Sequence, residues 1–230
     1  MENLFLKYMG ERLESSSTRL AHQGPVITIS RECGCPGNDI AEMLMNKLNK
    51  KMVKDGHAPK WKWVNKEILL KTSEELKMNP RDVETYVKAR ESGVLQDLVA
   101  SFTETYHVRN ANIKKVIHDV ILHLAIEGHV IVVGRGGGAI AWNIPKSLHL
   151  YLEAPLSWKS GVVSKQKGIP FAEARKFVLE RDMQRSKFRD NFRAKFSDEI
   201  YYDERFNCKS LTNEQICELA FHAAELKKLI

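Results

Sequence analysis

The feature that most constrains this fold is a short apolar segment that leads through a glycine turn into a helix, at residues 25–41 (PVITISRECGCPGNDIA). The apolar run at 26–29 predicts a buried strand, and Gly34 and Gly37 allow tight backbone turns. The following helix points its unpaired N–H groups and the positive end of its dipole into the turn. A strand, turn and helix in this order predict a binding site for a phosphate group.

The composition indicates one globular domain. The chain has 230 residues, of which 43% are hydrophobic and 28% are charged, which is enough to bury one sizeable core. The apolar run at 130–133 is far shorter than the ~20 residues that a membrane-spanning helix needs. Residues 1–20 mix apolar and charged side chains and lack the apolar centre of a signal peptide. We therefore expect a cytoplasmic protein without a membrane partner, with an arm at 1–24 and a domain at 25–230.

The formal net charge of +7 fits an anionic ligand, such as a nucleotide or a nucleic acid. Part of this charge is explained by a solvated helix face, because four lysines recur at helix-surface spacing: Lys47, Lys50, Lys51 and Lys54. Trp61 and Trp63 alternate with lysines, which suits either base stacking or an exposed edge strand. The two-residue alternation favours strand packing, so a nucleic-acid partner is not expected.

The four cysteines leave two interpretations open. Cys33 and Cys35 flank Gly34 and could be metal ligands, or they could be ordinary reduced thiols. No second cysteine pair has the matching spacing, since Cys208 and Cys217 stand far apart from each other. This pattern favours reduced thiols, and no metal-ligating residue is predicted.

Strands and helices alternate along the chain. Further strands are expected at 61–64, 129–133 and 147–153, and helices at 38–54, 66–76, 80–92, 94–105, 110–127, 156–167 and 170–189. Thr212 and Gln215 form a capping box ahead of a closing amphipathic helix. Strands with continuous apolar runs predict an α/β fold whose parallel central sheet is covered by helices on both faces. The phosphate turn then lies at the carboxyl edge of the sheet, where such sheets bind ligands.

Three segments together resemble the cytidylate kinase-like family, a branch of the P-loop nucleoside monophosphate kinases. They are residues 27–41, 130–138 and 148–185, and residues 202–212 are similar to the last strand and the start of the closing helix of that family. The resemblance implies a P-loop kinase fold with a helical monophosphate-binding region at 65–106 and a lid at 156–192. It also implies that the chain transfers the γ-phosphoryl group of ATP to CMP or dCMP with Mg²⁺.

The phosphate loop departs from the pattern G-x-x-x-x-G-K-[ST]. Backbone N–H groups from Gly34 to Asn38 can cradle phosphate oxygens, and Arg31 is near enough in sequence to lie over them. The resemblance places Gly37 where ordinary cytidylate kinases carry lysine, and Asn38 near the hydroxyl that holds magnesium. Asp39 is expected either to orient magnesium-bound water or to interact with the helix N-terminus.

Four further arginines are candidate phosphate ligands. Arg135 follows the strand at 129–133, where the resemblance implies an arginine that grips the acceptor monophosphate, although a surface arginine is the simpler alternative. Arg181, Arg185 and Arg189 recur every fourth residue and match the lid segment of the family in part. They are expected to clamp the phosphates of ATP when the lid closes, or else to form a solvated helix face. Arg135, Arg181 and Arg185 are the predicted catalytic residues, and Arg189 is a predicted cofactor ligand.

Three functions remain open from the sequence. The first is a cytidylate kinase-like enzyme that uses ATP and Mg²⁺. The second is a catalytically silent nucleotide-binding or regulatory protein that kept the fold without the loop lysine. The third is a basic nucleic-acid-binding protein, suggested by the charge and by Trp61 and Trp63.

Overall fold

The computed structural model describes residues 24–65, 121–122, 124–134, 136–190 and 202–230. Within these ranges, five strands form one sheet in the order β2-β3-β1-β4-β5, and every neighbouring pair is parallel. The strands are β1 at Val26–Arg31, β2 at Lys62–Val64, β3 at Val130–Val133, β4 at Ser147–Glu153 and β5 at Glu204–Asn207. The predicted α/β fold with a parallel central sheet is confirmed.

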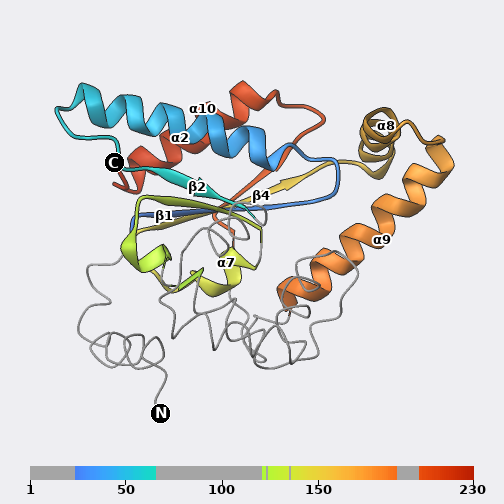
Figure 1. Ribbon diagram of the computed structural model, residues 1–230, viewed down its shortest axis with the longest axis horizontal. Coiled ribbons are helices and arrows are strands. Elements are labelled where there is room, and N and C mark those ends of the chain that lie inside the picture. Colours follow the sequence, from blue (N-terminus) through green and yellow to red (C-terminus); the bar gives the residue numbers. More distant parts are fainter. Residues whose placement is uncertain (1–23, 66–120, 123, 135, 191–201) are drawn as a thin grey trace, which may run out of the picture.

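Helices cover both faces of the sheet (Figure 1). On one face lie α2 at Gly37–Lys54 and α10 at Asn213–Leu226, and on the other lies the short α7 at Gly137–Ile140. The helices α8 at Leu156–Lys167 and α9 at Phe171–Asp190 pack on each other and extend beyond the edge of the sheet. No helix in the described ranges is long and apolar enough to cross a membrane.

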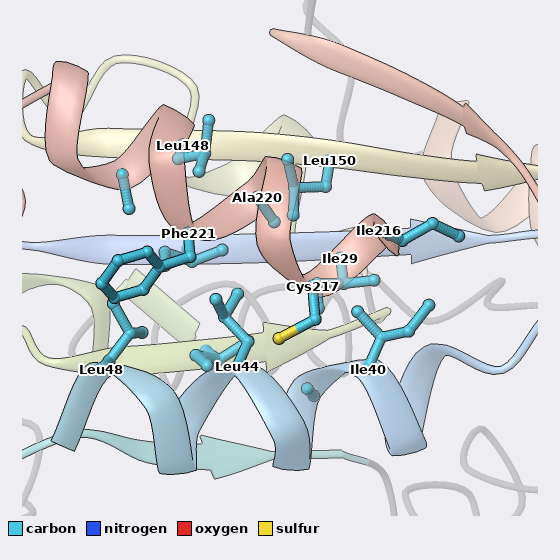
Figure 2. Packing of buried hydrophobic residues seen from close by; sticks show 14 of the residues in the cluster. Ile29, Ile40, Leu44, Leu48, Leu148, Leu150, Ile216, Cys217, Ala220 and Phe221 are labelled. Atoms are coloured by element: carbon cyan, nitrogen blue, oxygen red, sulfur yellow. The ribbon is translucent and has the colours of Figure 1, made fainter. Parts of the chain in front are cut away.

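Alternate residues of β1 and β3 pack into two separate hydrophobic cores. Ile29 of β1 and Leu150 of β4 point toward α2 and α10, where Leu44 and Phe221 fill the space between sheet and helices (Figure 2). Side chains on the opposite face pack under α7, and these include Val26, Val130, Val132, Ile140, Ala141 and Ile144. Burial on both faces is the physical reason for the continuous apolar run in β3, whereas the leucines of β4 alternate with Ser147, His149 and Tyr151.

Most element predictions agree with the described structure. The capping box is confirmed, because the Gln215 N–H donates to Thr212 Oγ1 at 3.2 Å and the Thr212 N–H donates to Gln215 Oε1 at 2.9 Å. Strand packing is also confirmed at the tryptophans, since β2 is an edge strand and Trp61 is only 3% exposed. The sequence did not predict α7. The predicted arm, almost all of the predicted monophosphate-binding region and the end of the lid lie outside the described residues.

A buried polar pair joins the neighbouring strands β1 and β4. Thr28 Oγ1 and His149 Nδ1 are 2.8 Å apart, and neither residue is more than 5% exposed. Burial lowers the pKa of His149 to about 4, although Asp203 opposes this shift. The imidazole is therefore neutral in the folded protein at pH 7.

Acidification is expected to destabilise the fold through His149. The pKa is lower in the folded protein, about 4 against the ordinary 6.5, so protons bind the unfolded chain first as the pH falls. Between pH 7 and pH 5 the free energy of unfolding should fall by about 2 kcal/mol from this group. Urea denaturation at both pH values checks this. A Thr28→Val/His149→Phe double variant should lose about 2 kcal/mol less than the wild type over the same interval, and an equal loss would contradict the assignment.

Candidate functional site

The turn after β1 is closed by its own hydrogen bonds. Gly34 has a φ of +84°, a left-handed conformation that turns the chain away from the strand. The Cys35 N–H donates to the Glu32 carbonyl at 3.3 Å, and the Gly37 N–H donates to the Cys35 carbonyl at 2.9 Å. Pro36, between them, has no N–H to donate.

The predicted cradle running from Gly34 to Asn38 is partly occupied by the loop's own hydrogen bonds. Two N–H groups of that segment already have backbone acceptors, and a third does not exist. The N–H groups of Gly34, Asn38 and Asp39 remain for a ligand in the described loop and first helical turn. Asn38 and Asp39 are exposed, and the start of α2 carries no side-chain cap. The start of the helix is therefore open to an anion.

Arg31 lies across the carboxyl edge of the sheet. Its aliphatic stem packs on Gly37, where an added Cβ would approach the Arg31 Cγ and Cδ atoms to 3.3 Å. Its guanidinium lies against Gly134 at the end of β3, so closely that a Cβ there would overlap Nη1. Gly134 also has a φ of +79°, so both backbone conformation and space require glycine. Arg31 thus links the phosphate loop to the turn after β3.

A buried charge cluster joins the loop to both lid helices. Lys159 of α8 is only 6% exposed, and its Nζ lies 2.8 Å from Glu32 Oε2 and 2.6 Å from Asp182 Oδ2. The second Asp182 oxygen accepts the Cys33 N–H at 2.6 Å, and Glu32 also accepts the Ala154 N–H at 3.2 Å. Burial alone would lower the pKa of the Lys159 ammonium, but the hydrogen bonds to Asp182 and Glu32 raise it above its ordinary value. Lys159 is therefore charged at neutral pH.

The side chains of the three arginines in the predicted lid make different contacts. Arg185 Nη1 donates to the Arg31 carbonyl at 3.3 Å, which brings it to the phosphate loop. The Arg181 guanidinium lies 4.9 Å from the centre of the Phe177 ring and bonds Gln184. Arg189 lies 5.4 Å from the centre of the Tyr151 ring. The structure thus brings Arg185 together with Arg31, while Arg135 lies outside the described residues.

Sequence reasoning missed the roles of Glu32 and Lys159 in this cluster. A signal was present, because Lys159 shares one side of α8 with the buried Ser160 and Val163. A lysine on the buried side of a helix needs a carboxylate partner. A charged residue directly after a buried strand, such as Glu32, is a natural candidate for that partner.

Most of the chain matches one known protein family. Residues 26–210 match the model of the cytidylate kinase-like family. This chain belongs to the cytidylate kinase-like family. The match confirms the resemblance seen in the sequence, and together with the parallel sheet it identifies the fold as P-loop kinase-like. The family is kinase-like and nucleotide-binding, which agrees with a phosphate site at the carboxyl edge of the sheet.

Solved structures are similar to this chain at low identity. An uncharacterized protein from Eubacterium ventriosum ATCC 27560 is 17% identical with a TM-score of 0.59, over 87% of this chain and 98% of that one. Shikimate kinase from Bacteroides thetaiotaomicron is 13% identical with a TM-score of 0.46, over 89% of this chain and 96% of that one. No curated protein matches this chain. The first of these similarities shows the fold alone.

Replacing Lys159 with methionine should separate the loop from the lid helices. Lys159→Met leaves Glu32 and Asp182 close together without a cation, so we expect a loss of about 3 kcal/mol in the free energy of unfolding. Lys165→Met is the matched control, because Lys165 is exposed on the same helix. Urea denaturation of both variants measures the difference. A loss no larger than that of Lys165→Met would show that the cluster does not stabilise the fold.

Proposed function

We propose that this chain is a nucleoside monophosphate kinase that transfers the γ-phosphoryl group of ATP to CMP or dCMP. One observation carries the proposal, namely the position of Arg31 between Gly37 in the phosphate loop and Gly134 after β3. The first turn is the expected position of the donor phosphates, and the second is the expected position of the acceptor phosphate. Phosphoryl transfer needs alignment and positive charge between donor and acceptor, and a guanidinium at this place supplies both.

The phosphates of ATP would be bound by the open start of α2. The N–H groups of Gly34, Asn38 and Asp39 would donate to phosphate oxygens, and the helix dipole favours the negative charge. Arg185, bonded to the Arg31 carbonyl, would add a second guanidinium from the lid. These two arginines would bind the ATP phosphates in place of the loop lysine, because glycine occupies position 37.

The loop also fits magnesium. The described residues contain no group of three or more histidine, cysteine or acidic side chains that could hold a metal ion. Mg²⁺ does not require one, because it is usually held by one or two carboxylates together with substrate phosphates and water. The exposed Asp39 carboxylate in the first turn of α2 would hold the ion through water. When bound, Mg²⁺ neutralises charge on the β- and γ-phosphates.

The remaining predicted residues complete the proposed site. Arg135 would hold the acceptor monophosphate from the turn after β3. Arg181 and Arg189, on α9, would exchange their contacts with Phe177 and Tyr151 for contacts with ATP as the lid closes. A guanidinium stacked on an aromatic ring in the open state can make this exchange at small cost, because such contacts contribute only about 0.5 to 1 kcal/mol at exposed sites.

A second candidate function is nucleotide binding without turnover. It is favoured by the self-bonded loop, in which the N–H groups of Cys35 and Gly37 already have acceptors. Gly37 and Asn38 lack the lysine and the hydroxyl of the usual phosphate loop, which also favours binding without turnover. Nucleic-acid binding is not proposed, because Trp61 is buried and therefore not available for base stacking.

A coupled ADP-release assay with ATP and Mg²⁺ tests the proposed reaction. We expect turnover with CMP or dCMP above that with UMP, AMP and GMP. Arg31→Ala should lower kcat/KM about 100-fold, because it removes a preorganised charge from the transferring group. Arg31→Lys should recover part of the activity, since it keeps the charge but not the planar geometry.

Arg175→Ala is the matched control, because Arg175 is exposed on α9 and its replacement removes the same charge. It should leave kcat/KM unchanged. Thermal unfolding of each variant would separate lost activity from lost folding. ATP binding without turnover in the wild-type protein would replace the kinase with the silent nucleotide-binding protein. Absence of ATP binding would reject both functions.

A further inference from the structure

The first half of the phosphate loop rests on the two lid helices. Cys33 is only 6% exposed and packs in an apolar cluster with Val163 of α8 and Val178 of α9. Gly34 lies against α8, since a Cβ added to it would come within 3.3 Å of the Lys159 carbonyl oxygen and 3.5 Å of Val163 Cγ2. The lid helices therefore shape the loop at the step from Cys33 to Gly34.

Asp182 of α9 binds the backbone at this step. Its Oδ1 atom accepts the Cys33 N–H at 2.6 Å. The Glu32 carbonyl, at the other end of the same peptide group, accepts the Cys35 N–H at 3.3 Å. Hydrogen bonds to a carboxylate are stronger than those to a neutral carbonyl. The peptide group between Glu32 and Cys33 is thus held at both ends, which restricts the direction of the neighbouring Gly34 N–H.

The Asp182 side chain is itself held in place. Its Oδ2 atom lies 2.6 Å from Lys159 Nζ, and that ammonium lies 2.8 Å from Glu32 Oε2. The same turn of α9 contacts the loop a second time, because Arg185 Nη1 donates to the Arg31 carbonyl at 3.3 Å. Helix α9 is therefore docked on the start of the loop through both a carboxylate and a guanidinium.

We propose that Asp182 is a positioning residue for ATP, which holds the Cys33 N–H and thereby fixes the direction of the Gly34 N–H. This role rests on the proposed function, in which the Gly34 N–H donates to the phosphates of ATP. A donor that is already oriented binds phosphate without the entropic cost of ordering the loop. The affinity for ATP then depends on the docking of α9, so the lid and the phosphate loop act together.

Asp182→Ala tests this role in titrations of the full chain with ATP and Mg²⁺. We expect binding about tenfold weaker than in the wild type, which is the effect of losing one hydrogen bond to a charged group. The KM for CMP should stay unchanged, because the turn after β3 keeps its contacts. Glu180→Ala is the matched control, since Glu180 is an exposed carboxylate on the same helix, and it should bind ATP as the wild type does. An unchanged ATP affinity in folded Asp182→Ala would overturn the proposal.

Two double variants separate the hydrogen bond of Asp182 from its charge. Lys159→Met/Asp182→Asn and Lys159→Met/Asp182→Ala lack the same two charges, but only the first keeps an oxygen at position 182. With the ammonium removed, the amide oxygen can accept the Cys33 N–H. The first variant should therefore bind ATP about tenfold more tightly than the second. Equal affinities would mean that Asp182 only neutralises Lys159, and the proposal would fall.

NMR of the ligand-free, isotope-labelled chain tests the loop without reference to ATP. The Cys33 amide should be protected from hydrogen exchange in the wild type, and rapid exchange there would overturn the proposal without any variant. The Cys33 and Gly34 amide resonances should move in Asp182→Ala but not in Glu180→Ala, and unmoved resonances in Asp182→Ala would also overturn it. Failure of the wild type to bind ATP would reject the proposed function and the ligand named here, while the amide resonances would still decide whether Asp182 fixes the loop.

Discussion

The parallel pairing of β1 with β3 on one side and β4 on the other determines where chemistry can occur in this protein. Parallel neighbours bring the carboxyl ends of all three strands to one edge of the sheet. The strands are buried on both faces, so charged groups are placed where the strands end. Arg31 and Glu32 stand at the end of β1, Gly134 follows β3, and Ala154 follows β4. The candidate site follows from this topology.

The cationic side chains at that edge have two different roles, one structural and one in the proposed ligand site. Lys159 lies close to the phosphate loop, but two carboxylates surround it and neutralise its charge. An ammonium this deeply buried must be paired, since an isolated one would carry a large desolvation penalty. Lys159 therefore joins the lid helices to the loop and is not the phosphate ligand that Gly37 fails to provide. Among the described residues, Arg185 and Arg31 are two guanidinium-bearing residues that contact each other at the loop.

Periodicity of apolar residues was enough to predict β1 to β4 and most described helices, because those features depend on local sequence. The polar pair Thr212 and Gln215 gave the capping box, and β5 was expected only from the family resemblance. It was not enough for α7, whose glycine-rich sequence has poor helix propensity and is held in place by packing under β1 and β3. Helical spacing placed Arg181, Arg185 and Arg189 on related turns but could not show which side chain reaches the loop. Arg181 and Arg189 lie against the rings of Phe177 and Tyr151, and tertiary packing determines these contacts.

The closed phosphate loop was also beyond prediction, because glycines permit several turns and the chosen one depends on the bonds to Glu32 and Cys35. Its closure does not by itself exclude a phosphate. A neutral backbone hydrogen bond contributes about 1 kcal/mol net, whereas one to a charged group contributes about 1.5 to 3 kcal/mol. An arriving phosphate can therefore exchange the internal bond of Gly37 for a stronger one, provided that the Cys35 backbone is free to move.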